Sequence, residues 1–153
     1  MMQLTNKFDY SIRGLVYLAA NSRNHICHLD KIASEVNVSQ AFLSKIFQQF
    51  TKIGLVRSYR GAGGGFVLGR QPEKISLLEV VEAVEGPISL NRCNDRNSGY
   101  DQHYNCSTHP VWTQVQMQVR ETLQSITLKD LAGSQQDIMN SRLHGYGSIS
   151  CAL

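Results

Sequence analysis

The first third of the chain carries apolar residues at helical spacing. One face of Asn6–Ser22 is apolar, and so is one face of Leu29–Val36. A third apolar stripe follows Ser39, a favourable N-cap residue, and ends at Gly54, a residue type common at helix C-termini. This third stripe consists of Phe42, Leu43, Ile46, Phe47, Phe50 and Ile53. The pattern predicts three amphipathic helices, the last two joined by the short connection Asn37-Val38.

A glycine-tipped hairpin is predicted to follow the third helix. Residues 55–60 and 66–68 have the short pattern of strands, with Val56 and Tyr59 among polar neighbours. The run Gly61-Ala62-Gly63-Gly64-Gly65 between them supplies a turn. Two short helices, a tight connection and such a hairpin form a winged helix-turn-helix. The sequence therefore predicts a mainly α fold with a small β-hairpin wing.

The second half of the chain is predicted to hold an irregular loop between two helices. Helical spacing covers Ile75–Val84 and stops at Gly86-Pro87, and residues 88–109 show no period. After Pro110, which suits the first position of a helix, apolar residues recur at spacings of three, four and seven. This coiled-coil-like spacing predicts a dimerisation helix whose seam is Trp112, Val115, Val119 and Ile126.

These elements divide the chain into four parts. Residues 1–86 are predicted to form the winged helix-turn-helix domain, residues 87–109 a sensor loop, and residues 110–132 the dimerisation helix with one short helix after it. Residues 133–153 are polar and rich in glycine and serine, so we expect a disordered tail. A hydrophobic content of 42% and a charged content of 18% are typical of a globular protein.

Charge and cysteine content narrow the class of partner and the compartment. The formal net charge of +3 permits a polyanionic partner without requiring one, so the placement of the basic residues decides the matter. No stretch approaches the roughly 20 apolar residues of a membrane helix, and the N-terminus lacks the apolar core of a secretory signal. We expect a cytoplasmic protein whose four cysteines are thiols, metal ligands or redox sensors.

The third helix and the hairpin carry residue types that bind DNA. The second helix of a helix-turn-helix enters the major groove, where polar side chains reach base edges and phosphates. Any amphipathic helix has a polar face, so the hairpin adds the more specific signal, arginines beside glycines that admit close backbone approach. The candidate DNA-binding residues are Ser39, Gln40, Ser44, Lys45, Gln48, Arg57, Arg60, Gly61, Gly63 and Gly64.

Five stretches of the sequence carry a family resemblance. They are Leu4–Tyr10, Ser39–Ile46, the wing run Gly54–Gly69, Leu77–Gly86 and Ile126–Leu131. Together they resemble the IscR/NsrR/CymR family of bacterial winged-helix regulators, from residue 3 to about residue 132. The resemblance implies a homodimer whose two recognition helices bind a palindromic site in double-stranded DNA.

The same resemblance assigns grooves to the candidate residues and marks one departure. It implies that Ser39, Gln40 and the pair Ser44-Lys45 face the major groove, while Arg60 and the glycines lie at the minor groove. IscR-like members have Glu-Gln where this chain has Ser44-Lys45. The operator sequence therefore does not transfer from those members to this chain.

The irregular loop holds a candidate iron–sulfur site. Cys106-Ser-Thr-His109 resembles the Cys-x-x-His segment of cluster-binding family members, which implies Cys93, Cys106 and His109 as ligands. Thiolates with an imidazole are a reasonable ligand set for an iron–sulfur cluster. The cofactor that the resemblance implies is a 2Fe–2S cluster in preference to a 4Fe–4S cluster.

The ligand count is one short, because the cluster-binding members carry a third loop cysteine that this chain lacks. Asp9 falls where members similar to NsrR use an acidic residue from the partner subunit, so the resemblance implies Asp9 as the fourth ligand. His103 and Asp101 are local alternatives in the loop. We treat Cys27 and Cys151 as incidental.

A cluster-free regulator of the same fold is the alternative. The two loop cysteines would then be free thiols, form a redox-switchable disulfide, or remain from an ancestor that bound a cluster. CymR-like members sense through a protein partner, and Gly86-Pro87-Ile88-Ser89 is similar to them. Zinc suits the same ligands, but the paired C-x-x-C arrangement is missing.

Two other function classes are less well supported. The sequence has no G-x-S-x-G or H-E-x-x-H motif, and Glu79, Glu82 and Glu85 are interpreted as the solvated face of a helix, so we do not expect an enzyme. A winged helix that binds only proteins would lack salt-dependent DNA binding. The hypothesis from sequence is a homodimeric repressor whose operator affinity depends on a cluster that senses redox state, nitric oxide, or iron and sulfur supply.

Overall fold

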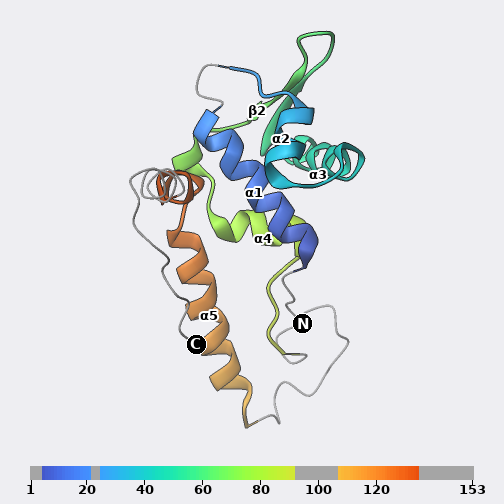
Figure 1. Ribbon diagram of the computed structural model, residues 1–153. Coiled ribbons are helices and arrows are strands. Elements are labelled where there is room, and N and C mark those ends of the chain that lie inside the picture. The colour runs from blue at the N-terminus through green and yellow to red at the C-terminus, as the bar shows by residue number, and fades with distance from the viewer. Residues whose placement is uncertain (1–4, 22–24, 92–106, 135–153) are drawn as a thin grey trace, which may run out of the picture.

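The computed structural model describes residues 5–21, 25–91 and 107–134. Within these ranges the chain is mainly helical, with one two-stranded antiparallel hairpin (Figure 1). In chain order the elements are α1 (Asn6–Asn21), α2 (Leu29–Val36), α3 (Gln40–Lys52), β1 (Val56–Tyr59), β2 (Gly65–Leu68), the 3-10 turn η1 (Pro72–Lys74), α4 (Leu77–Glu85) and α5 (His109–Ser125). Residues 128–134 are helical as well. The mainly α fold with a β-hairpin wing is confirmed.

The connection between α2 and α3 is a tight turn with a clear local cause. Asn37 follows α2 in the left-handed region, at φ 57° and ψ 54°, which asparagine adopts more readily than most residues. Val38 then donates its amide to the carbonyl of Ala33 at 3.0 Å. Ser39 caps α3 by accepting from the amide of Phe42 at 3.3 Å. The predicted turn and the predicted N-cap are both confirmed.

The three N-terminal helices enclose a core centred on Phe47. Its side chain is fully buried, and its ring centroid lies 5.0 Å from that of Phe66 in β2. Gly14 lets α1 approach closely, because a Cβ there would lie 3.1 Å from the Phe47 ring. The same core includes Leu15, Leu18, Ile32, Val36, Leu43, Ile46, Phe50, Leu55, Val56, Ile75, Val80 and Leu128. The predicted recognition helix α3 is thereby held against both α1 and the wing.

The wing gains a third backbone neighbour from residues 26–28. The two strands pair with Tyr59 opposite Gly65. Cys27 and Phe66 exchange both backbone hydrogen bonds, with N–O distances of 3.0 and 2.8 Å. Gly65 makes this approach possible, since a Cβ there would lie 2.3 Å from the carbonyl oxygen of Cys27. The segment before α2 therefore holds the hairpin against the helices.

Acidic side chains of α4 join this helix to three other parts of the chain. One reaches the base of the wing, one reaches α5, and one accepts hydrogen bonds from the residue before α1. The pairs are Glu79–Arg70, Glu82–Arg120 and Glu85–Thr5. The sequence predicts a solvated acidic face, but the structure gives each carboxylate a partner. α4 is therefore bonded to residues next to the wing and next to α1, and to α5.

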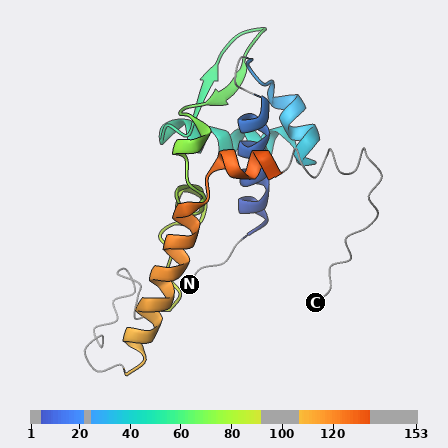
Figure 2. The ribbon, with the colours of Figure 1, turned by 90° about the vertical axis from the view of Figure 1, so that its left-hand side faces the viewer.

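The chain returns to the winged domain after α5. The amide of Leu77 donates to the carbonyl of Ile126 at 2.8 Å, and the amide of Leu128 donates to the carbonyl of Ile75 at 3.0 Å. Leu128 is fully buried in the main core. α5 itself extends away from this domain, so its first turn and the wing lie at opposite ends of the molecule (Figures 1 and 2).

Candidate nucleic-acid interface

The polar face of α3 presents the predicted recognition residues. Ser39, Gln40, Lys45 and Gln48 are exposed, and Ser44 is half-buried. The opposite face of the helix is packed into the core. The side chain of Gln48 lies 3.5 Å from the hydroxyl of Ser44, which leaves both groups at the surface of the helix. The structure thus brings all five residues to one accessible helix face.

Phe42 differs from its prediction as part of the apolar stripe of α3. Its side chain is 37% exposed, and its ring lies nearly perpendicular to that of Tyr10 in α1, with ring centroids 6.0 Å apart. The other apolar side chains of the stripe within the helix are buried, namely Leu43, Ile46, Phe47 and Phe50. Phe42 therefore flanks the polar face instead of closing the core.

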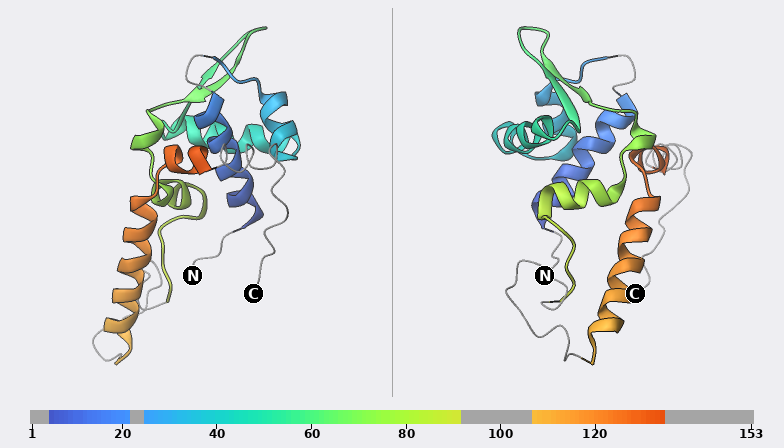
Figure 3. Two further views of the ribbon diagram at one scale, coloured as in Figure 1. Left: turned by 60° about the vertical axis from the view of Figure 1, so that its left-hand side comes forward. Right: turned by 180° about the vertical axis from the view of Figure 1, so that it is seen from behind.

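The hairpin adds an exposed basic edge next to this helix. Arg57 and Arg60 are exposed, as are Gly61 and Gly63 in the turn, while Gly64 is half-buried. α3 and the hairpin lie at the same end of the molecule, away from the first turn of α5 (Figures 1 and 3). The predicted wing residues therefore belong to the same end as the recognition helix.

Charge is strongly one-sided in this part of the chain. Residues 36–72 contain no aspartate or glutamate. The same stretch contains five basic residues, Lys45, Lys52, Arg57, Arg60 and Arg70. Among the described residues, the first four make no ion pair, whereas Arg70 is paired with Glu79 of α4. A polyanion approaching α3 and the wing would therefore meet four uncompensated positive charges.

Two surface residues of this face were not among the sequence candidates. Tyr59 was grouped with Val56, but Val56 is buried and Tyr59 is 47% exposed. Residues three apart lie on opposite sides of a strand, so the period of two places Tyr59 beside Arg57 instead. Lys52 is exposed in the last turn of α3. Strand alternation could have identified Tyr59, while Lys52 had no signal beyond its charge.

The candidate cluster ligands are only partly within the described residues. Cys93 and Cys106, with the alternatives Asp101 and His103, lie outside them. His109 begins α5 and is half-buried, one residue earlier than the predicted start at Pro110. In the part of the chain that the structure describes, no three histidine, cysteine or acidic side chains are grouped to hold a metal.

Asp9 lies on α1, away from the first turn of α5. Its carboxylate is paired with Arg13 one helical turn later, at an Nη2–Oδ2 distance of 3.1 Å. The side chain of Asp9 is 50% exposed and that of Arg13 is 59% exposed. Exposed pairs of this kind contribute only about 0.3–0.5 kcal/mol, so Arg13 does not lock Asp9 in place. Within one chain the first turn of α1, which holds Asp9, and the first turn of α5, which holds His109, lie apart (Figure 1).

The predicted dimerisation seam has two kinds of surroundings. Val119 packs with Leu123 against a small apolar cluster of Leu78, Val81 and Ile88 in the same chain. Ile126 lies just after α5, which ends at Ser125. Trp112 is 39% exposed, and Val115 is half-buried. In the first half of α5, from His109 to its midpoint, the apolar residues Val111, Trp112 and Met117 are all exposed.

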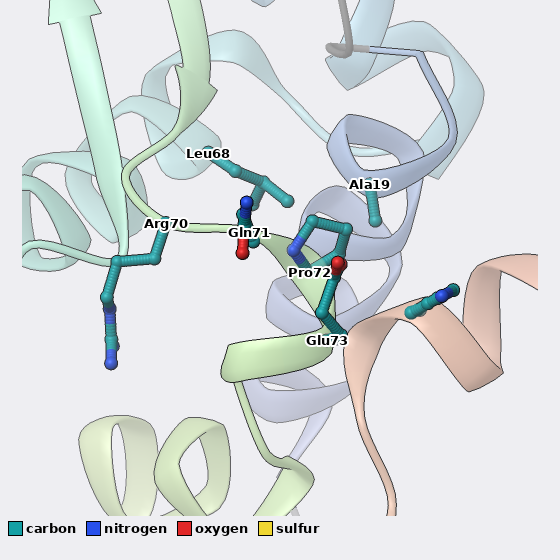
Figure 4. A pocket seen from close by; sticks show the side chains of 7 residues that line it. Ala19, Leu68, Arg70, Gln71, Pro72 and Glu73 are labelled. Atoms are coloured by element: carbon teal, nitrogen blue, oxygen red, sulfur yellow. The ribbon is translucent and has the colours of Figure 1, made fainter.

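A cavity of about 460 Å³ lies at the base of the wing on the side away from α3 (Figure 4). It is lined by Ala19, Leu68, Arg70, Gln71, Pro72, Glu73 and Lys129. The Arg70 side chain points away from Pro72, in keeping with its pairing to Glu79. The charged groups that remain at the cavity are the carboxylate of Glu73 and the ammonium group of Lys129, and this pair alone does not form a catalytic site.

No described helix combines the length and apolar character needed to cross a bilayer.

The comparison with known proteins agrees with this geometry. The family model "Rrf2: Iron-dependent Transcriptional regulator" matches residues 4–134. The HTH-type transcriptional regulator IscR of Xenorhabdus nematophila is 32% identical over 135 residues, which cover 88% of this chain and 82% of that protein. IscR of Klebsiella pneumoniae is equally similar, with the same coverage.

Solved structures show the same fold. CymR of B. subtilis, described as the global cysteine regulator, has a TM-score of 0.72 and 30% identity, over 88% of this chain and 98% of that one. IscR of T. potens has a TM-score of 0.67 and 24% identity, over 96% and 93%. The relatives from Xenorhabdus and Klebsiella are named as transcriptional regulators and CymR as a regulator, and none of these three is named as an enzyme. Because the family match runs from before α1 to the last described helical residue, the chain belongs to the Rrf2 family of transcriptional regulators.

Proposed function

We propose that this protein is a homodimeric repressor that binds a palindromic site in double-stranded DNA, with its affinity controlled by an iron–sulfur cluster. The observation that carries the DNA-binding part is the acid-free stretch 36–72. It carries four basic side chains on α3 and the wing that have no ion-pair partner among the described residues. Polar recognition side chains supply base contacts in the major groove, and the wing arginines reach the minor groove or phosphates.

The dimer that this proposal requires would form through α5. Its N-terminal half carries exposed apolar residues on a helix that extends beyond the other described elements (Figure 2). Val119 packs against α4, and Trp112 and Val115 lie on the same helix face nearer the start of α5. Two such helices packed together would place two recognition helices on one duplex, as a palindrome requires.

The available donors suit an iron–sulfur cluster in chemistry and in reach. The amide of Leu90 donates to the side chain of Gln116 in α5, at 3.2 Å. Along α5, Gln116 is seven residues from His109, which is about 10 Å. Cys93 follows Leu90 by three residues, and an extended chain of that length spans up to about 10 Å, enough to reach the level of His109. Cys93, Cys106 and His109 can therefore share one site, and Asp9 of the partner subunit is the proposed fourth donor.

When bound, such a cluster would supply a redox- and nitric-oxide-sensitive group whose charge and ligation change with the signal. The chain's own contacts connect that end of α5 to the DNA-binding end. Arg120 of α5 pairs with Glu82 of α4. The next residue, Ala83, accepts a hydrogen bond from the side chain of Gln49 in α3 at 2.7 Å. A shift of α5 would therefore move the recognition helix and change the half-site spacing of the dimer.

A cluster-free regulator of the same fold is the second candidate. The loop lacks the third cysteine of the cluster-binding members, and CymR of B. subtilis has the same fold with 30% identity. Staphylococcus aureus CymR in an oxidized form is also similar, with 27% identity and a TM-score of 0.67. In this candidate, DNA binding is controlled either by oxidation of the two loop cysteines or by binding of a protein partner.

Anaerobic purification followed by a visible absorption spectrum separates the two candidates. We expect a brown protein with iron and acid-labile sulfide in matched amounts, because two thiolates and one imidazole are available in a single short segment. Cys106→Ala is expected to lose the colour, whereas Cys27→Ala, which removes a buried thiol beside the wing, should keep it. A wild-type protein that stays colourless after reconstitution would contradict the cluster and favour thiol or partner control.

A further inference from the structure

His28 occupies an N-cap position without capping its helix. Residues at this position usually have a side-chain oxygen that accepts from the first turn, and His28 has the extended backbone of an N-cap, at φ −72° and ψ 142°. Its side chain makes no capping hydrogen bond. Instead, its Nδ1 lies 2.7 Å from the carbonyl oxygen of Gly64 in the wing turn. Because a carbonyl only accepts, Nδ1 carries the proton and donates it.

The carbonyl that His28 contacts belongs to a tightly constrained turn. The amide of Gly64 donates to the carbonyl of Gly61 at 2.9 Å. A Cβ on Gly64 would lie 2.5 Å from the carbonyl oxygen of Tyr59, so the turn folds closely over its own backbone. Arg60 immediately precedes this turn. A bond to Gly64 therefore fixes the backbone that carries the wing arginine.

Little else holds the end of the wing. Each strand has four residues, and a two-stranded hairpin of this size is marginally stable alone. The backbone pairing of Cys27 with Phe66 lies nearer the base of the hairpin. Among the described residues, the bond from His28 is the one hydrogen bond that joins residues 61–64 to a segment outside the hairpin.

We propose that His28 is a positioning residue for DNA binding, which holds the wing turn where Arg60 can enter the minor groove. The proposal rests on the proposed function, since it requires the wing to contact DNA. A turn rich in glycine loses much conformational freedom when DNA orders it, and a bond that orders it beforehand lowers that cost. A neutral hydrogen bond of this kind corresponds to an affinity change of about three- to tenfold.

The decisive variant is His28→Ser, because serine caps a helix well but cannot reach the wing. If His28 served only the folding of α2, serine would keep or improve both stability and DNA binding. As a positioning residue, its loss is expected to weaken binding three- to tenfold with the melting temperature kept. Affinity is measured by fluorescence anisotropy on a duplex that the wild-type protein selects from random-sequence DNA, and His28→Ala serves as the non-capping comparison.

A double-mutant cycle locates the effect in the wing. With Arg60→Ala already present, His28→Ser is expected to change affinity less than twofold, because the contact that it positions is gone. With Lys45→Ala on α3, the two losses should multiply. Backbone order parameters of residues 61–64 are expected to fall in His28→Ser while those of α3 do not change.

Two results would overturn the proposal, and they differ from a failure of the proposed function. The proposal is wrong if Arg60→Ala weakens binding but His28→Ser binds as wild type does, or if the His28 and Arg60 losses multiply. If Arg60→Ala alone bound DNA as tightly as the wild type does, the wing would not contact DNA through Arg60. The proposed function would then fail at the wing, and the role of His28 in DNA binding would fail with it. In every case the order parameters report independently whether His28 holds the turn.

Discussion

Replacing Phe47 with alanine is expected to lower the free energy of unfolding by about 3–5 kcal/mol, the usual cost of removing a buried phenylalanine. Phe47 is fully buried where α1, α3 and the wing meet. Its ring contacts the Gly14 position and lies 5.0 and 6.2 Å from the ring centroids of Phe66 and Phe50. The side chains of α1, α3 and the wing that surround this ring cannot all move inward together, so most of the cavity left by the substitution would remain.

Phe42→Ala is the matched control, with the same chemical change on the same helix. Phe42 is 37% exposed and packs against Tyr10, so its loss should cost about 1–2 kcal/mol. Urea unfolding followed by far-UV circular dichroism measures both variants, at one protein concentration because a dimer is stabilised by mass action. Equal destabilisation by the two substitutions would contradict the core described above.

The second large effect is expected for the double substitution Arg57→Ala, Arg60→Ala. A dimer would lose four positive charges at the duplex, so operator affinity near physiological salt should fall about a hundredfold or more. The slope of log affinity against log salt should become shallower by roughly 2–4. Fluorescence anisotropy over a range of salt concentrations, on the selected duplex, measures both quantities.

Lys74→Ala, Lys129→Ala removes the same charge from the opposite side of the molecule. Both residues are exposed, and η1 and residues 128–134 lie on the side away from α3 (Figures 1 and 3). This control should change affinity only a few-fold through the overall field of the protein. If it weakened binding as much as the wing variant, the DNA-binding surface would not lie on α3 and the hairpin.

Much of the fold could be predicted from the sequence because its causes are local. The capping hydroxyl of Ser39 confirmed the start of α3, and Gly54 at φ +77° confirmed its end. The glycine run between residues 61 and 65 predicted the wing turn. Each of these features depends on neighbours within a few residues, which a pattern along the chain can report.

The remainder depends on contacts between distant parts of the chain. Periodicity placed Phe42 and Phe47 on one stripe, but which of them is covered depends on the angle at which α1 crosses α3. The three glutamates of α4 matched a solvated face, and their partners lie up to 80 residues away in sequence. Leu128 was grouped with the dimerisation helix, although residues 126–128 pair beside residues 75–77.

The candidate site shows the same division. The polar face of α3 followed from helical period, and the exposed wing arginines followed from composition. The bond between His28 and Gly64 joins residues 36 apart, and histidine at an N-cap gives no sequence signal for it. Cys93 and Cys106 were assigned as ligands by the family resemblance alone, and both lie outside the described residues. Their role therefore stays a prediction.

The most direct test of the central claim compares operator binding with and without the cluster in a single preparation. Protein purified without oxygen is divided, one half is stripped of iron with a chelator, and the dissociation constant of each half for the selected duplex is measured anaerobically. A coupling of about 1–3 kcal/mol predicts a difference of five- to 150-fold. Equal dissociation constants for a brown sample and its stripped counterpart would contradict cluster control of DNA binding.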